Sequence, residues 1–201
     1  MSDIYISIVS HGNDLDIINN TNLVEVNGLE NVTVIIRDNI TSDKLKEYCV
    51  DKGFIYNASS ETLGFGANNN RNYVIAEELG LTKDDWFVLM NPDVLIDLNN
   101  INKLVSLLNK KNESLFAINL YKDQNFLVSD DSLRYFPDLC SLVKLFIKKP
   151  VADNYNKEEL NDASIVDWAA GSFLIVKSSL YQALSGFDER YFMYYEDVDF
   201  C

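Results

Sequence analysis

The sequence predicts an α/β fold in which an open, mostly parallel sheet carries helices on both faces. Short apolar runs alternate with longer segments whose apolar residues recur at helical spacing, and this β–α repetition is typical of parallel sheets. The chain has 201 residues, of which 47% are hydrophobic, so one domain can bury a sizeable core. No internal repeat or low-complexity linker divides it.

The predicted strands are short and apolar. Residues 4–9 form a nearly continuous apolar run, as expected for a strand that is buried on both faces of a parallel sheet. Runs of the same kind predict further strands over residues 32–36, 54–56, 86–90, 115–120 and 172–176.

Helices are predicted between these strands. Apolar residues fall on one helical face within residues 14–26, and Thr41 or Ser42 is a typical cap for a second helix. Glycines follow several helical segments, at the position where a left-handed residue commonly ends a helix. The helices are expected over residues 14–26, 41–52, 68–79, 98–110 and 178–184.

Residues 121–165 interrupt this pattern. They are polar, aperiodic and rich in Asp and Asn, apart from an amphipathic helix that is expected near residues 138–148. We interpret them as an excursion over the sheet.

Charge and cysteine content exclude several classes of protein. The net charge is −14 and the 17 Lys and Arg residues are scattered, so nucleic-acid binding is not expected. Three distant cysteines and one histidine do not suit a zinc site or a disulfide framework. The first residues lack the features of a signal peptide, and no apolar stretch is long enough to span a bilayer. A cytoplasmic location is therefore predicted.

Ligands of open α/β sheets bind beyond the carboxyl ends of the strands, so candidate site residues are sought there. Ser10 and His11 follow the first strand, and we interpret His11 as a turn residue near the ligand. Asp38 follows the second strand, where its carboxylate can accept hydrogen bonds from a base or a ribose. Taken alone, a turn or helix-capping role is the favoured alternative for Asp38.

Gly64 and Gly66 precede a helical segment that carries Asn70 and Arg71. Glycines let the backbone approach a ligand closely, and the neighbouring amides and the guanidinium supply hydrogen-bond donors. This is not the Rossmann fingerprint, because the third glycine is missing and the segment follows the third strand. A glycine turn with asparagine capping explains the segment equally well.

Asn91-Pro92-Asp93 follows the buried run 86–90. Pro92 holds its φ near about −65° and favours an extended Asn91, which sets Asp93 just beyond the strand. A carboxylate there suits Mg²⁺ or Mn²⁺, because these ions complete their shells with phosphate oxygens and water. An Asx-type turn is the equal alternative.

Two later segments complete the candidates. Trp168 lies three residues before Gly171, and its ring can face a sugar, although a core tryptophan beside a turn is at least as common. Residues 187–199 hold five carboxylates among five aromatic residues. Buried or clustered carboxylates have raised pKa values, which suits a general base, whereas an acidic helix N-terminus is the favoured alternative.

In their order and spacing, these motifs resemble the inverting family 2 glycosyltransferases with the GT-A fold, especially bacterial rhamnosyltransferase-like members. The resemblance covers nearly the whole chain and is most specific in Tyr195-Glu196-Asp197-Val198-Asp199. The other matching segments are residues 6–10, 38–39, 63–71, 89–94, 134–137, 168–172 and 186–189.

The resemblance implies a role for each candidate. Asp197 is expected to be the catalytic base, with Glu196 beside it. Asp93 is expected to bind Mg²⁺ or Mn²⁺, and Asn91 stands where the family's DxD-type motif has its first carboxylate. The other candidates are expected to bind the nucleotide sugar, with Asp38 at the nucleoside: Ser10, His11, Asp38, Gly64, Gly66, Asn70, Arg71, Asn91, Trp168 and Gly171.

The implied reaction is sugar transfer with inversion from a nucleotide-diphosphate sugar, dTDP-rhamnose in the most similar subfamily, to a saccharide or lipid-linked acceptor. Residues 1–201 would form one catalytic domain, with a nucleotide-sugar-binding half (1–120) and an acceptor and catalytic half (121–201) that lacks the family's usual C-terminal extension. Peripheral association with the inner face of a membrane is implied as well.

Two alternatives remain open at this point. The first is a truncated, non-catalytic nucleotide-sugar-binding fragment, which keeps the donor half alone. The second is a sugar nucleotidyltransferase, which should carry a basic, glycine-rich loop after its first strand. Residues 10–13 have no such cation, which argues against the second alternative.

Overall fold

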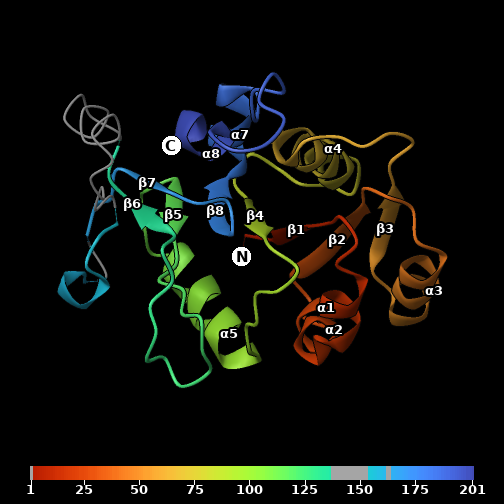
Figure 1. Ribbon diagram of the computed structural model, residues 1–201, viewed down its shortest axis with the longest axis horizontal. Coiled ribbons are helices and arrows are strands. Elements are labelled where there is room, and N and C mark those ends of the chain that lie inside the picture. Colours follow the sequence, from red (N-terminus) through yellow and green to blue (C-terminus); the bar gives the residue numbers. More distant parts are fainter. Residues whose placement is uncertain (1, 137–153, 162–163) are drawn as a thin grey trace, which may run out of the picture.

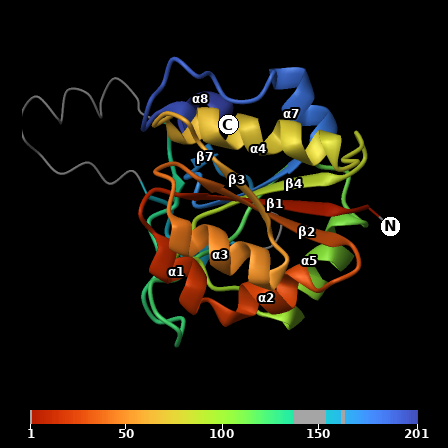
Figure 2. The ribbon, with the colours of Figure 1, turned by 90° about the vertical axis from the view of Figure 1, so that its right-hand side faces the viewer.

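The computed structural model describes residues 2–136, 154–161 and 164–201 (Figure 1). It confirms the predicted fold class, because a six-stranded, mostly parallel sheet lies between two layers of helices (Figure 2). The strand order is β3-β2-β1-β4-β8-β5. The helix that was expected near residues 138–148 lies outside the described residues.

Four parallel strands form the centre and one side of the sheet: β1 (Ile4–Ser10), β2 (Val32–Asp38), β3 (Ile55–Ala58) and β4 (Trp86–Met90). All five residues of β4 are buried, as the continuous apolar run predicted. The adjacent side chains of Trp86 and Phe87 belong to different core clusters, one on each face of the sheet.

The last two strands break the parallel pattern. β8 (Phe173–Lys177) runs antiparallel to β4 and also to β5 (Leu115–Ala117). Because β8 runs against β4, it begins where β4 ends, and Met90 lies opposite Phe173. The residues just before β8 therefore reach the same edge of the sheet as the residues that follow the parallel strands.

One layer of helices consists of α1 (Asp14–Asn19), α2 (Thr21–Asn27), α3 (Asp43–Lys52) and α5 (Leu98–Leu108). The prediction of one helix over residues 14–26 is wrong, since Asn20 has non-helical angles and separates α1 from α2. Its side-chain amide donates to the carbonyl of Val94 at 3.0 Å, so a tertiary contact holds this break.

The other layer consists of α4 (Phe65–Glu78), α7 (Ser178–Leu184) and α8 (Glu196–Phe200). α4 begins three residues before the predicted start, because the backbone of Gly64 serves as its N-cap. Tyr73 of α4 stacks on Tyr181 of α7 at a centroid distance of 4.3 Å, and Phe187 stacks on Phe200 of α8 at 4.5 Å. Aromatic packing thus holds this layer together.

Short secondary-structure elements hold the described part of the excursion (residues 121–165) in place. β6 (Leu133–Arg134) pairs with β7 (Trp168–Ala169), and the 3₁₀ helix η1 (Lys157–Glu159) lies between them in the chain. The ammonium of Lys157 is buried and donates to the carbonyl of Leu120 at 2.9 Å. Among the described residues, no helix is long and apolar enough to cross a membrane.

Candidate active site

Two acidic segments that lie about a hundred residues apart in sequence meet through the residues before β8. The backbone N–H of Asn91, after β4, donates to the carbonyl of Ser172 at 2.9 Å. The backbone N–H of Gly171 donates to a carboxylate oxygen of Asp197 at 3.3 Å. The turn that carries Asp93 and the start of α8 are therefore connected by only two consecutive residues, Gly171 and Ser172.

Asp93 lies in a turn that is closed by a hydrogen bond from the Val94 N–H to the Asn91 carbonyl at 3.1 Å. Pro92 is buried, whereas the Asp93 side chain is exposed. Within the described residues, no group of three or more His, Cys, Asp or Glu side chains could enclose a metal ion. One exposed carboxylate still fits Mg²⁺ or Mn²⁺, because these ions commonly bind one or two carboxylates and take substrate phosphates and water as further ligands.

Glu196 and Asp197 are adjacent but lie in different environments. Glu196 is only 5% exposed, and its Oε2 has no hydrogen-bond partner among the described residues. Burial raises the pKa of Glu196, and the neighbouring Asp197 carboxylate raises it further. Asp197 is half-buried and accepts hydrogen bonds from the backbone N–H groups of Gly171 and Val198. Asp197 is therefore the more accessible carboxylate of the pair.

A second unsatisfied oxygen lies at the same edge of the sheet. The hydroxyl of Ser172 is buried and, like Glu196 Oε2, has no partner in the described part of the chain. Unsatisfied buried polar atoms are rare in folded proteins, and functional sites are one place where they persist. Two of the four such atoms among the described residues lie on these neighbouring segments, which supports a candidate active site at this edge.

Gly64 and Gly66 do make the close backbone approach that was expected, but they make it to the chain itself. A Cβ on Gly64 would lie 2.1 Å from the carbonyl oxygen of Phe192, and that oxygen also accepts the Phe65 N–H at 3.2 Å. A Cβ on Gly66 would lie 2.7 Å from the Cβ of Phe187. The two glycines thus allow the segment 187–196, which leads to Glu196 and Asp197, to pack closely against the start of α4.

Replacing Gly64 with alanine is expected to destabilise the protein by about 3 kcal/mol, because backbone atoms of Phe192 would have to move. Gly28 is the matched control: its φ is −79° and a Cβ would be 3.3 Å from its nearest neighbour, so Gly28→Ala should change stability by no more than about 0.5 kcal/mol. Urea unfolding of both variants measures the difference. Equal urea midpoints for the two variants would show that close packing of the 187–196 segment against Gly64 does not contribute to stability.

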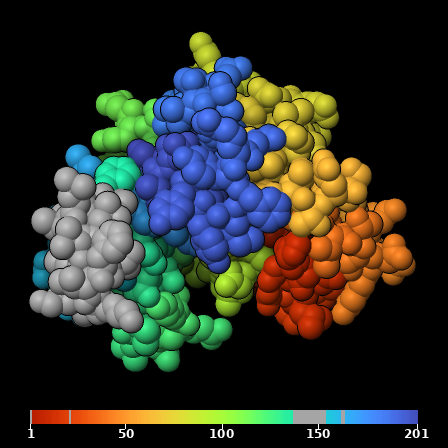
Figure 3. Space-filling view, turned by 45° about the horizontal axis from the view of Figure 1, so that its top comes forward, coloured from red at the N-terminus to blue at the C-terminus, as the bar shows by residue number. Residues whose placement is uncertain are grey.

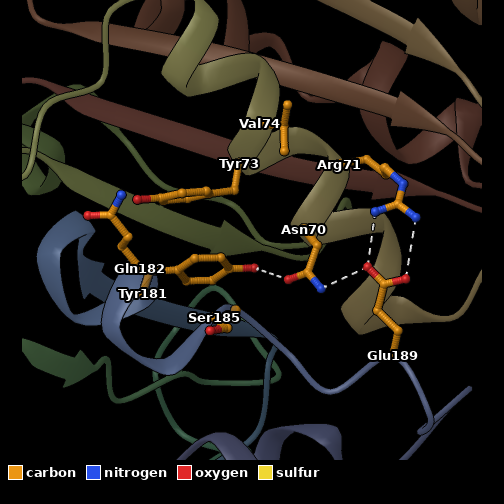
Figure 4. Close-up of a pocket in the computed structure, with 9 residues that line it drawn as sticks. Asn70, Arg71, Tyr73, Val74, Tyr181, Gln182, Ser185 and Glu189 are labelled. Atoms are coloured by element: carbon orange, nitrogen blue, oxygen red, sulfur yellow. Dashed lines mark hydrogen bonds and ion pairs between the residues drawn. The ribbon is translucent and has the colours of Figure 1, made fainter.

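Asn70 and Arg71 are engaged with the segment that follows α7 (Figure 4). The Asn70 side chain accepts from the Tyr181 hydroxyl at 2.7 Å and donates to the Phe187 carbonyl at 2.9 Å. Arg71 forms two hydrogen bonds with the Glu189 carboxylate, at 3.0 and 3.3 Å. Both side chains therefore have partners within the protein, and their binding to a ligand stays a prediction.

Sequence reasoning missed a buried polar cluster beneath α4. Arg37 is 8% exposed and donates to the side chains of Asn68, Asn57 and Ser59 at 2.7, 2.5 and 3.1 Å. No ion pair with Arg37 is found in the described part of the chain, and burial lowers the pKa of its guanidinium. The remaining members of the cluster are Ser7, Asn69 and Asn72. The signals in the sequence were an arginine directly after the apolar run 32–36 and the run of asparagines at residues 68–70.

Asp38 is fully buried, and its carboxylate is occupied by its own loop. It accepts the backbone N–H groups of residues 40–42 and the hydroxyl of Tyr56. These contacts are those of the turn alternative, in which Asp38 shapes the loop after β2.

The loops after β1 and β2 are joined through Asn39. Its amide contacts His11 Nδ1 at 3.2 Å and exchanges two hydrogen bonds with the backbone of Leu63, each 2.9 Å long. The hydroxyl of Ser10 accepts the Asn13 N–H at 3.2 Å, and His11 itself is exposed. His11 is therefore placed on the surface of the carboxyl edge.

Trp168 lies on the excursion side of the site. It is half-buried, and its indole N–H donates to the carbonyl of Tyr135 at 2.9 Å. The Arg134 guanidinium lies 5.5 Å from the centre of its ring. Gly171, three residues on, faces Phe65, whose ring would be 2.7 Å from an added Cβ. Of these two residues, Gly171 contacts Asp197, whereas the Trp168 side chain contacts Tyr135 and Arg134.

Comparison with known proteins identifies relatives over nearly the whole chain. No model of a protein family matches it. It is 31% identical over 202 residues to the rhamnosyltransferase WbbL of Escherichia coli K12, covering 98% of this chain and 75% of that protein. It is 29% identical over 182 residues to the N-acetylglucosaminyl-diphospho-decaprenol L-rhamnosyltransferase of Mycobacterium tuberculosis, covering 84% of this chain and 59% of that protein.

Solved structures share the fold at low sequence identity. The mannosyltransferase PcManGT of Pyrobaculum calidifontis, in complex with GDP-Man and Mn²⁺, gives a TM-score of 0.58 at 12% identity, over 94% of this chain and 50% of that one. TarS of S. aureus gives 0.63 at 13% identity, over 98% and 32%. The fold is that of the GT-A glycosyltransferases. The sequence identity with the E. coli protein defines the family within this fold. The chain belongs to the rhamnosyltransferase-like family 2 glycosyltransferases.

Proposed function

We propose that this chain moves a sugar from a nucleotide-diphosphate sugar to a hydroxyl group of a saccharide or lipid-linked acceptor, with inversion. The observation that carries the proposal is the junction at Gly171 and Ser172, which brings the Asp93 turn and Asp197 to one edge of the sheet. Displacement at an anomeric carbon needs a base for the attacking hydroxyl and stabilisation of the leaving diphosphate. The two acidic segments divide these tasks.

In the proposed reaction, Asp197 takes the proton of the acceptor hydroxyl while that oxygen bonds to the anomeric carbon. The bond from this carbon to the diphosphate oxygen breaks, and the nucleoside diphosphate leaves. Asp197 suits the task better than Glu196, because Glu196 is buried against Gly66. Asp93 would hold Mg²⁺ or Mn²⁺, and such an ion supplies positive charge beside a diphosphate.

The donor side of the site is proposed to lie along the loops after β1, β2 and β4. Ser10, His11, Asn91 and the loop shaped by Asp38 would face the nucleotide. Gly64, Gly66, Asn70 and Arg71 would support the donor site by holding the 187–196 segment, and Trp168 and Gly171 would shape the sugar pocket. dTDP-rhamnose is our first choice of donor, because the two relatives are called rhamnosyltransferases.

The acceptor is proposed to be lipid-linked. The name of the M. tuberculosis relative includes a diphospho-decaprenol, which supports an acceptor of this kind. Such an acceptor would bring the enzyme to the inner face of a membrane from the cytoplasm.

A thermal-shift screen of dTDP-rhamnose, UDP-GlcNAc and GDP-mannose, each with and without Mn²⁺, tests the donor side. A true donor should raise the melting temperature as its concentration increases, because it binds only the folded state. Transfer to N-acetylglucosaminyl diphosphate with a short lipid chain then tests the reaction. Donor binding without transfer would favour the binding-fragment alternative, and no stabilisation by any nucleotide sugar would contradict the proposal.

A further inference from the structure

Five consecutive large side chains before α8 are exposed, from Tyr191 to Tyr195. Tyr194 is 73% and Tyr195 66% exposed, although both immediately precede Glu196 and Asp197. Figure 3 shows the C-terminal residues, in blue, at the centre of this face and beside a hollow near the N-terminal residues, in red. A contiguous exposed apolar patch on a folded protein commonly marks a binding surface.

The backbone of Tyr194 and Tyr195 is in the left-handed region, with φ of +67° at both residues. Asn, Asp and Gly tolerate this region far better than tyrosine does, so folding alone would favour one of them here. Non-glycine residues in this conformation persist where the surrounding structure holds them, and they cluster at functional sites.

The segment is held on both sides of the two tyrosines. Before them, the Phe192 carbonyl accepts the Phe65 N–H and presses against Gly64. After them, Glu196 is buried and Asp197 accepts the Gly171 N–H. The Tyr195 carbonyl also accepts the Asp199 N–H at 2.9 Å, so Tyr195 begins the helix that carries Asp197. The backbone from which the two rings project is therefore held in place relative to Asp197.

We propose that Tyr194 and Tyr195 bind the sugar ring of the acceptor and place its hydroxyl at Asp197, an inference that rests on the proposed function. An aromatic ring offers an apolar face to the C–H face of a pyranose, and a phenol adds a polar group at its edge. No hydrogen bond to the hydroxyl of Tyr194 or Tyr195 is found within the described part of the chain, so both hydroxyls are available to a ligand.

Ser185 provides a matched control. It is also exposed, and its φ is +63°. It ends α7, where a left-handed residue is a common helix terminus, so the fold itself accounts for its conformation. An asparagine should reduce the backbone strain of the left-handed conformation equally well at residues 185, 194 and 195. Only Tyr194 and Tyr195 are proposed to contact the acceptor.

The experiment compares Tyr194→Asn, Tyr195→Asn and Ser185→Asn with the wild type. Acceptor binding is measured by calorimetry in the presence of dTDP, with N-acetylglucosaminyl diphosphate carrying a short lipid chain as the probe. Each tyrosine variant is expected to bind this probe at least tenfold more weakly than the wild type, without a lower melting temperature and with unchanged affinity for dTDP. Ser185→Asn should bind the probe like the wild type, and Tyr194→Phe should keep most of the affinity.

Three results would overturn the inference. The first is a wild type that does not bind the probe, and the second is normal binding of the probe by the tyrosine variants. The third is a loss of probe affinity in the tyrosine variants that comes with weaker dTDP binding or a lower melting temperature. Failure of the proposed function would look different. A wild type that binds the probe through the tyrosines but transfers no sugar supports the inference and contradicts transfer.

Discussion

Asp197→Asn is expected to reduce sugar transfer by a factor of about 10³ to 10⁴ while the protein stays folded and binds its donor. An asparagine keeps the size of the side chain and can still accept the Gly171 N–H, but it cannot take a proton from the acceptor hydroxyl. General-base catalysis contributes about 10² to 10⁴ in rate, so a loss near the upper end is expected if no other group replaces Asp197. Steady-state transfer and donor-dependent thermal shifts measure the two parts of this prediction.

Asp199→Asn is the control for charge on α8. Asp199 is exposed on the same short helix, so its replacement removes the same charge two residues away. Its transfer rate should stay within about twofold of the wild type, since screened surface charges interact weakly. Normal turnover by Asp197→Asn, or an equal loss in both variants, would remove Asp197 from the role of base.

Asp93→Ala is expected to abolish the part of donor binding that depends on Mn²⁺. Loss of the single carboxylate in the Asn91–Val94 turn leaves the ion only substrate and water ligands here, so the donor affinity measured with Mn²⁺ should fall by about tenfold or more. Without the metal, the variant and the wild type should bind the donor alike. Calorimetric titrations with dTDP-rhamnose measure the donor affinity of the wild type and of the variant, each with and without Mn²⁺.

Asp84→Asn is the matched control for Asp93→Ala. Asp84 is also exposed, but it precedes β4 and so lies at the opposite edge of the sheet. Its replacement should leave the donor affinity unchanged, both with and without Mn²⁺. If Asp93→Ala retains the full effect of Mn²⁺, the metal is held elsewhere and Asp93 is a turn residue.

The alternation of apolar runs and helical segments predicted most of the sheet and its two helical layers, because burial of both faces requires that pattern. Element boundaries were less predictable where a tertiary contact decides them. Asn20 separates two helices by reaching Val94, and Gly64 allows α4 to start early by accommodating Phe192. Neither partner is close in sequence, so local periodicity carries no trace of either contact.

In the candidate site, too, some features could be predicted from the sequence and others depend on tertiary contacts. The motifs at Asp93 and at Glu196-Asp197 were visible as residues, and the resemblance assigned their roles. Gly64, Gly66, Asn70 and Arg71 were predicted to bind a ligand, which stays a prediction, and the structure adds that they contact residues of the chain between 181 and 192. Glycines and amides serve a close backbone packing contact and a ligand equally well, so their type alone does not identify the partner.

By itself, the sequence determined the fold class and the two acidic motifs, and its resemblance to known enzymes indicated the glycosyltransferase family, because all three depend on the types and order of residues along the chain. The tertiary structure alone decided that β8 is antiparallel and so delivers Gly171 and Ser172 to the end of β4. It also decided that Glu196 is buried while Asp197 is accessible, and that two exposed tyrosines are held in a left-handed backbone beside them. Strand direction, burial and backbone strain arise from contacts between distant segments, and only the folded chain brings those segments together.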